Sequence, residues 1–478
     1  MEKKTEERDN PRRKGLLKRL VGHASACAGL YAGLCLPVAM AQNPSPALPQ
    51  LPPPTRTPAP PAPLPPMTPG PMLTLQQAEA MAVQNHPQIQ AAQNEAAFSN
   101  QQIVEQRAAY LPTVTGDITG SGANENARIG AGFISDSRLF DRFGAGFQLN
   151  QLITDLGRTN NLVASSRLEA QASAQNVTAT RYNVLLALNR AYFDVLHSKA
   201  LIRTAQETIN TRQTVLNQIT QLANNQLRSQ LDVSFADVNL SEAKVLLIQA
   251  QNSLSESYAE LARALGTDRV VNYEVQDEPL PPAPPANPDD LVAQAIANRP
   301  EFASLRFSRD AAYKFAEAEK DLKRPVVNAL GVVGYIPYIQ QLGSTPIPSE
   351  YGGAALNVTI PIFNGHLFTA RHEAALDRAM ESDQRLRDEQ FRLSRDVRQA
   401  WAAATTAYQR IDVTAQLVEQ TNMAVNLAQG RYNLGLASIV ELSQSQLNQT
   451  QAEIENLSAK YDYQALYQAL QYTIGQLR

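Results

Sequence analysis

The chain carries a long internal repeat. Asn85-His86-Pro87 recurs as Asn298-Arg299-Pro300, and Pro112 recurs as Pro325, in both cases 213 residues later. Further pairs keep offsets of 208 or 209 residues: Gly157 and Gly365, Arg190 and Arg398, Leu265-Gly266 and Ile474-Gly475. A unit of this length is far longer than the repeat of a solenoid. We therefore expect a duplicated half-module, in which each half holds elements that the other half completes.

The first 72 residues have the character of a leader and a tether. A basic stretch from Arg12 to Arg19, an apolar run to Val38 and the motif Ala39-Met40-Ala41 predict a secretory signal peptide over residues 1–41. A membrane anchor is the alternative, but the apolar run is short and rich in small residues. Residues 42–72 are rich in proline, which predicts an extended and disordered tether.

Cysteine usage and charge exclude several classes of function. Cys27 and Cys35 both lie in the predicted signal peptide, so the mature chain would have no disulfide and no thiol chemistry. Lipidation of Cys27 is disfavoured because charged Lys18 and Arg19 shortly precede it. Cleavage after residue 41 would leave 34 Lys and Arg against 41 Asp and Glu, a net charge of −7. Such a chain has no basic surface with which to hold nucleic acid.

Each repeat follows one plan. We expect the first repeat over 73–278, a proline-rich connector over 279–288 and the second repeat over 289–478. Short helices come first, and prolines break them because the residue before a proline disfavours helix. Two strands of about ten residues follow in each repeat, at about 112–122, 143–154, 325–340 and 351–363. Long helices then occupy about 158–265 and 366–475.

The strands alternate between apolar and polar residues. Val114, Gly116 and Ile118 alternate with threonine and aspartate, and Leu356 and Val358 alternate in the same way. Ten residues are the length that a tilted strand needs to cross a bilayer, with one apolar and one polar face.

The helices carry apolar residues at spacings of three and four. Ile202, Ala205, Ile209, Leu216 and Ile219 form one such seam, typical of coiled coils. In the second repeat a further seam runs beside the first, which requires a neighbouring helix on either side. A helix of about 65 residues would be about 100 Å long.

Four strands cannot close a barrel, and an open strand edge is not stable in lipid. Three copies would supply 12 strands, an even number within the range of outer-membrane barrels. The predicted fold class is therefore mixed α and β: a trimeric 12-stranded transmembrane β-barrel, continued by a long periplasmic α-helical coiled-coil barrel.

Three segments resemble the TolC-like outer membrane efflux protein family, the outer membrane factors of tripartite efflux systems. They are Tyr110-Leu111-Pro112-Thr113-Val114, Ile360-Pro361-Ile362-Phe363-Asn364-Gly365, and the turn from Tyr432 to Leu442 with Gly435, Ser438 and Glu441. The first repeat keeps Ser229 and Asp232 of this turn. The likeness extends from Leu73 to Arg478 and implies that Pro112, Pro325 and Pro361 lie at the entrance to the barrel.

The resemblance also implies partners and a gate. It implies a homotrimer in lipid of the outer membrane that works passively with a periplasmic adaptor and an inner-membrane pump. Asp232 and Glu441 would bring six carboxylates to the axis of the closed periplasmic tip, and Tyr432 would tie neighbouring coils through Asp232. In a second, compatible interpretation, the two carboxylates favour the N-termini of the helices that follow the turns.

The turn also departs from the family pattern. Ala437 stands where the member with the best-known gate has an arginine, and Gln444 replaces a second acidic ring. Closure is then expected to rely on Arg431 or Arg228. The two copies differ here as well, because Ala223 and Gln226 correspond to Tyr432 and Gly435.

Other signals point to no site. His366 and His372 lack a third ligand, so a helical surface is favoured over a metal, and the two glycine-rich motifs near residues 130 and 144 do not continue into a nucleotide fingerprint. We expect no cofactor and no enzymatic activity. Aromatic residues near the strands are expected to form interfacial girdles: Phe140, Phe143, Phe147, Tyr335, Tyr338, Tyr351 and Phe363.

The predicted function is a passive exit duct that exports small molecules. One alternative is the duct of a type I protein secretion system. An alternative of another class is a periplasmic coiled-coil scaffold without a pore, which the alternating strands disfavour.

Overall fold

A computed structural model describes residues 70–477, apart from 123–127, 132–133, 139–141 and 340–347. The predicted signal peptide and residues 42–69 of the predicted tether lie outside the described residues. So do Phe140 and the side chain of Tyr338, which belong to the predicted aromatic girdles.

Both repeats consist of two short and two long helices. In the first repeat these are α1 (Leu75–Asn85), α2 (Pro87–Ala108), α3 (Arg158–Asn224) and α4 (Gln230–Ala264). In the second they are α5 (Pro288–Asn298), α6 (Pro300–Lys320), α7 (Leu367–Asn433) and α8 (Ile439–Thr473). A single 3-10 turn, η1 (Asp321–Lys323), extends α6. Pro87 and Pro300 begin a new helix in both copies, because a proline is tolerated in the first turn, where its missing N–H leaves no bond unmade.

The structure corrects the register of the repeat. Helices α3 and α7 each have 67 residues, and α4 and α8 each have 35, so the long helices correspond at an offset of 209 throughout. Gly157 therefore corresponds to His366, not to Gly365, and each is the left-handed residue before its helix. The offset of 208 is wrong because Gly157 is the second, and Gly365 the first, of two consecutive residues with positive φ before the long helix.

Four antiparallel strands form the main sheet, in the order β2 (Thr113–Ser121), β5 (Arg142–Thr154), β7 (Val326–Ile339) and β8 (Glu350–Thr359). The expected last strand, 351–363, is too long, since β8 ends at Thr359. Pro361 has no N–H with which to continue the ladder. Among the described residues, β2 and β8 each have one strand partner, so both edges of this sheet are open.

Two small sheets were not predicted. β3 (Arg128–Ala131) and β4 (Ile134–Arg138) form a hairpin between β2 and β5. β1 (Met72–Leu73) pairs in parallel with β6 (Glu274–Val275), so Met72 belongs to the fold and not to the tether. Tyr192 of α3 joins this pair, because its hydroxyl oxygen lies 2.8 Å from the Gln276 carbonyl oxygen and 3.1 Å from that of Leu73.

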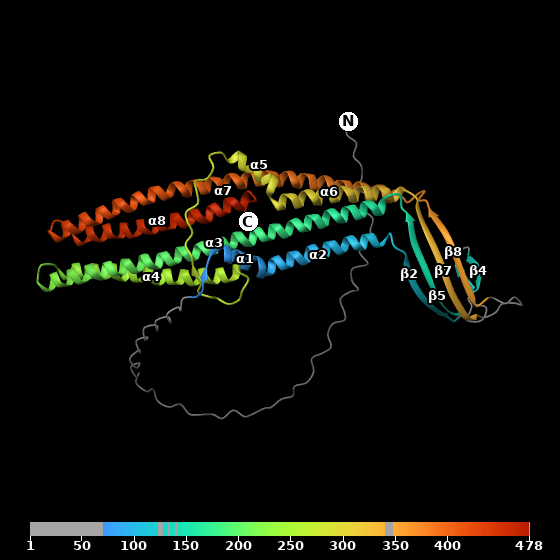
Figure 1. The fold of residues 1–478 in the computed structure, drawn as a ribbon, viewed down its shortest axis with the longest axis horizontal. Helices are drawn as coiled ribbons and strands as arrows, with labels where there is room; N and C mark the ends of the chain where they lie inside the picture. The colour runs from blue at the N-terminus through green and yellow to red at the C-terminus, as the bar shows by residue number, and fades with distance from the viewer. Residues whose placement is uncertain (1–69, 123–127, 132–133, 139–141, 340–347, 478) are drawn as a thin grey trace, which may run out of the picture. The chain divides into compact units, whose positions relative to one another are not determined.

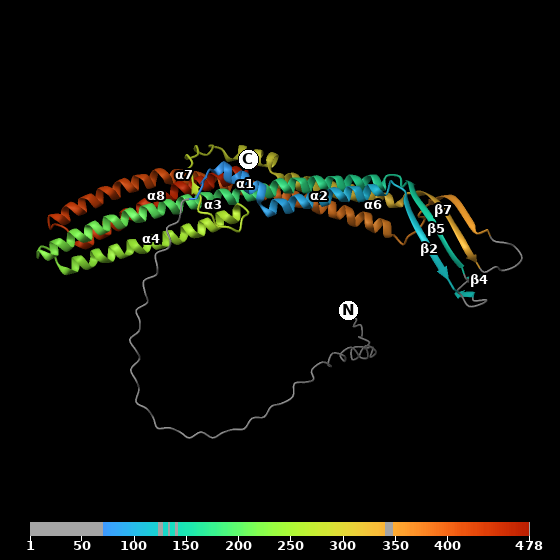
Figure 2. The same cartoon turned by 60° about the horizontal axis from the view of Figure 1, so that its bottom comes forward.

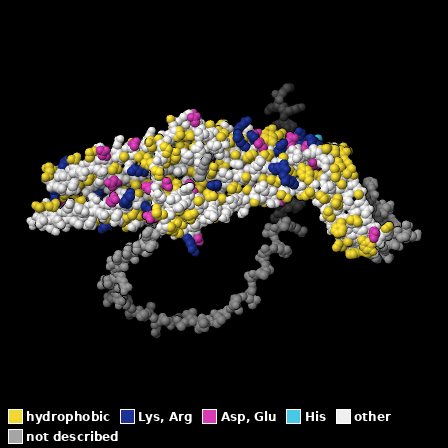
Figure 3. Space-filling view, in the orientation of Figure 1, with side chains coloured by type: hydrophobic (Ala, Val, Ile, Leu, Met, Phe, Trp, Pro, Cys, Tyr) yellow, Lys and Arg dark blue, Asp and Glu magenta, His cyan; other side chains and the backbone are white. Residues whose placement is uncertain are grey.

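The main sheet has one apolar and one polar face, as the alternation predicts. Cross-strand pairs place Ile118 opposite Ala145, Phe147 opposite Val333, and Val327 opposite Val358 on one face. On β2, β5 and β8 the other face carries mainly Thr, Asn, Gln and Gly residues, whereas β7 also places Leu330 and Val332 there. Several of the apolar side chains are largely exposed, Ile118 to 77% and Phe147 to 63%. Hydrophobic side chains gather on the face of the sheet that Figure 3 shows.

The long helices lie in two antiparallel pairs, α3 with α4 and α7 with α8 (Figure 1, Figure 2). α1 packs on the first pair and α5 on the second, and each forms an apolar cluster with its pair. A third cluster joins the two pairs at the turns, far from the sheet. Of the helices that the structure describes, none combines the length and apolarity needed to cross a membrane.

Candidate functional site

The turns between the long helices have matching local geometry. Ser229 caps α4 by accepting a hydrogen bond from the Asp232 amide, and Ser438 caps α8 by accepting one from the Glu441 amide, both at 3.3 Å. Asp232 and Glu441 thus lie in the first helical turn, where a negative charge is favourable. Their local setting fits the helix-stabilising interpretation, which is compatible with a further role in a trimer.

Tyr432 joins the two turns. It is only 1% exposed, and its hydroxyl donates to the Asp232 carboxylate across 3.4 Å. Arg228 from the first turn lies over the Tyr432 ring, with its guanidinium carbon 4.3 Å from the ring centroid, and donates to the Tyr432 carbonyl oxygen. The arrangement therefore links the end of α7 to the start of α4, about two hundred residues earlier in the sequence.

The environment of Tyr432 keeps its hydroxyl protonated. Burial raises the pKa of Tyr432 above the ordinary value of 10.0, and the nearby charge of Asp232 acts in the same direction. Arg228 opposes this rise. The hydroxyl consequently remains a hydrogen-bond donor at neutral pH and into the alkaline range.

The two candidate arginines have different partners. Arg431 pairs with Glu441 at 3.5 Å within the second turn, and both side chains are about half exposed. Exposed pairs of this kind contribute little to stability, about 0–1 kcal/mol. Arg228 instead crosses from one repeat to the other. Of the two, Arg228 is placed to hold the two hairpins together.

Equivalent positions of the two helical turns hold different residue types. Gly435 has a φ of +76°, and Gln226, 209 residues earlier, has a φ of +60°. Glycine adopts this left-handed conformation without a steric penalty, whereas glutamine does not. Ala223 occupies the position equivalent to Tyr432, so the first hairpin has neither the tyrosine nor the glycine.

A buried arginine near this site was not identified from the sequence. Arg212 of α3 is 7% exposed and donates to Gln446 Oε1 and, across 3.3 Å, to Thr450 Oγ1, both of α8. Burial lowers the pKa of Arg212 to about 10. It borders a cavity of about 400 Å³ between α3, α4 and α8. The sequence did indicate that this arginine is unusual, because Arg212 interrupts the apolar seam between Ile209 and Leu216.

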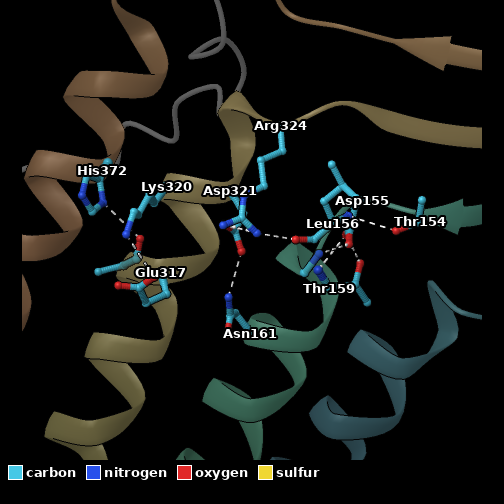
Figure 4. A network of polar contacts seen from close by, with 12 residues as sticks. Thr154, Asp155, Leu156, Thr159, Asn161, Glu317, Lys320, Asp321, Arg324 and His372 are labelled. Carbon is cyan, nitrogen blue, oxygen red and sulfur yellow. Dashed lines mark hydrogen bonds and ion pairs between the residues drawn. The ribbon is translucent and has the colours of Figure 1, made fainter.

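A second polar network lies where the helices meet the sheet (Figure 4). Asp321 of η1, whose side chain is 2% exposed, accepts a hydrogen bond from the Asn161 side-chain amide at 2.9 Å and pairs with Arg324 at 3.1 Å. Arg324 also donates to the Leu156 carbonyl oxygen at 2.5 Å. The network ties the start of α3 to the segment before β7.

The prolines of this region lie beside the strands. Pro112 directly precedes β2, Pro325 directly precedes β7, and Pro361 follows β8. His366 is the residue before α7, and His372 Nδ1 lies 3.1 Å from the Ala316 carbonyl oxygen. No group of three or more His, Cys, Asp or Glu residues that could hold a metal ion occurs in the described part of the chain.

Comparisons with known proteins agree on one family. The model of the outer membrane efflux protein family matches residues 80–267 and 291–476, which is most of both repeats. The outer membrane efflux protein BepC of Brucella suis is 19% identical over 84% of this chain and 86% of its own length. The alkaline protease secretion protein AprF of Pseudomonas aeruginosa is 26% identical over 83% of each chain.

Solved structures have the same fold. A crystal structure of CusC superimposes with a TM-score of 0.74 at 16% identity, covering 84% of this chain and 92% of CusC. The fold is thus that of the TolC-type outer membrane channels, a helical part joined to a β part. The chain belongs to the outer membrane efflux protein family, and its place is the outer membrane.

Proposed function

We propose that three copies of the chain form a passive exit duct through which small molecules leave the periplasm. The main sheet carries the proposal: it has an apolar face, a polar face and two open edges. Three such sheets would close a 12-stranded barrel whose apolar face meets lipid and whose polar face lines a pore. The long helices would continue the duct into the periplasm, towards an adaptor and an inner-membrane pump that supplies the energy.

The helical turns would form a gate at the periplasmic end. Tyr432, Asp232 and Arg228 hold the two hairpins of one chain together, and they leave Glu441 and Arg431 exposed at the turn. In a trimer the acidic residues would ring the axis, where they would favour cations. Opening would then require the hairpins to separate at Tyr432.

The proposal is tested by purification followed by mass measurement and bilayer recording. A duct should extract only with detergent, have the mass of three chains and conduct ions. A chain that purifies without detergent as a monomer and does not conduct would instead be a periplasmic scaffold.

A type I protein secretion duct is a second candidate, and the likeness to AprF favours it. Deletion of the gene separates the two functions. Loss of a small-molecule duct should sensitise cells to some members of a panel of toxic compounds, with the set of secreted proteins unchanged. Loss of a secretion duct should remove one or more proteins from the medium and leave the sensitivities as they were.

A further inference from the structure

The two repeats of one chain pack against each other in a geometry that two separate copies could repeat. Within the chain, α3 packs on α6 and β5 pairs with β7, and this is where the first repeat meets the second. The open edges consist of the equivalent elements: α7 and β8 on one side, α2 and β2 on the other. A second copy placed by the same relation would bring its α2 and β2 against α7 and β8.

The seam within the chain is polar at the junction of helices and sheet. Asn161 of α3 donates to the buried Asp321, and Arg324 donates to the Leu156 carbonyl oxygen (Figure 4). In addition, a guanidinium nitrogen of Arg158 lies 3.8 Å from Glu319 Oε1. We refer to these contacts as the polar clasp. Its members come from the start of α3 and the residues just before it, and from the end of α6 and the segment that leads to β7.

Most of the equivalent residues on the open edges are apolar. With an offset of 209 on the α7 side, Arg158 corresponds to Leu367 and Asn161 to Ala370. With an offset of 213 on the α2 side, Asp321 corresponds to Ala108 and Arg324 to Leu111. Four of the five polar side-chain positions of the clasp are therefore occupied by two leucines and two alanines, whereas the position of Glu319 is occupied by the polar Gln106.

These apolar side chains are exposed in the single chain. Leu111 is 65% exposed and Leu367 is 49% exposed, and Ala108 and Ala370 are also exposed. By contrast, the Asp321 side chain in the internal seam is 2% exposed. Because the two repeats are equivalent, we infer that a second copy of the same chain would cover these side chains.

We propose that Leu367 and Ala370 of one copy pack against Ala108 and Leu111 of the next, so that an apolar contact closes the seam between copies where a polar clasp closes it within the chain. The inference rests on the proposed trimer and specifies its interface. Above the contact, the same relation pairs β8 with β2 of the next copy and places Val358 opposite Ile118.

The free-energy cost of bringing separate copies together explains why the contact between copies is apolar and the contact within the chain is polar. The two repeats of one chain are covalently linked, so their effective concentration is high and directional polar contacts suffice. Separate copies must also overcome the loss of translational and rotational freedom. Burial of apolar area supplies that free energy without the cost of desolvating charged groups.

Cysteine crosslinking tests whether Ala108 of one copy lies next to Ala370 of another. Because both native cysteines lie in the predicted signal peptide, the mature background should contain no thiol. The double variant Ala108→Cys with Ala370→Cys, purified in detergent and treated with a short bis-maleimide, should shift from one chain to two and three chains in denaturing gels. Each single variant, and the pair Ala108→Cys with Arg371→Cys on the adjacent face of α7, should remain mainly one chain.

Substitution of Leu111 tests whether the contact between copies must be apolar. Leu111→Asp should lose the native three-chain mass, whereas Leu111→Met, which keeps apolar volume, should retain it. If wild-type trimers form and conduct but the double-cysteine variant stays uncrosslinked, or Leu111→Asp trimers are as stable as wild type, this inference is overturned and the duct stands. If the wild type is a non-conducting monomer, the proposed function fails together with the inference.

Discussion

Removal of the Tyr432 hydroxyl should weaken closure of the periplasmic tip. Tyr432→Phe deletes the 3.4 Å hydrogen bond to Asp232 and keeps the ring that packs under Arg228. Because the bond is long, we assign it about 1 kcal/mol, below the usual range for a charged acceptor. A trimer has three such bonds. If opening breaks all of them, the loss is about 3 kcal/mol, or roughly a hundredfold in the ratio of closed to open channels.

Single-channel recording in planar bilayers measures this ratio. Asp232→Ala removes the other partner of the bond, so the double variant should open little more than either single variant. Tyr258→Phe is the matched control, because the Tyr258 hydroxyl donates to the Tyr273 carbonyl at 2.7 Å, remote from the turns. If the Tyr432→Phe, Asp232→Ala double variant conducts as the wild type does, the reasoning is refuted.

The same bond predicts a response to alkaline pH. The pKa of Tyr432 is raised by burial and by Asp232, so the folded state favours the protonated hydroxyl. The stabilisation is complete below the ordinary tyrosine value of 10.0 and is lost as the pH rises through the higher folded value. Open probability should therefore increase only above that ordinary value, and Tyr432→Phe should abolish this step.

Three further predictions concern stability and are measured as thermal unfolding in detergent. Asp321→Ala should cost about 1 kcal/mol, because it leaves the half-buried Asn161 amide without its acceptor and Arg324 without its ion-pair partner. Gly435→Ala should cost about 1 kcal/mol at a φ of +76°, whereas Gln226→Gly at +60° should be neutral or stabilising; equal effects of the two would contradict the strain argument. Gly334→Val should displace the Tyr351 ring, which its added atoms would overlap, at a cost of about 1 kcal/mol, and the double variant with Tyr351→Ala should remove that cost.

Local rules accounted for much of the fold. The alternation around Ile118 indicated which face of β2 is apolar, because successive residues of any strand point to opposite sides. Pro87 and Pro300 marked the breaks between the short helices, since proline restricts its own backbone and that of the preceding residue. The sequence predicted the spacing between equivalent residues of the two repeats less accurately. Gly157 and Gly365 looked equivalent, but two consecutive residues have a positive φ in each copy, Leu156-Gly157 and Gly365-His366, so a glycine can occupy either position.

The site depended on contacts that sequence order does not reveal. Nothing local to Arg228 indicates that it will lie on the Tyr432 ring, and nothing local to Asn161 indicates that it will bind Asp321. The position of Arg212 in an apolar seam does not indicate that Gln446 and Thr450 of α8 will accept its hydrogen bonds.

The sequence by itself determined the duplicated plan, the two faces of the strands and the length of the helices, because these follow from residue periodicity and from proline. Only the tertiary structure decided the exact register of the two halves and the polar clasp that joins them. It also revealed the apolar residues that occupy the equivalent positions on the open edges. Those features depend on which distant segments come together, and packing between elements settles that question.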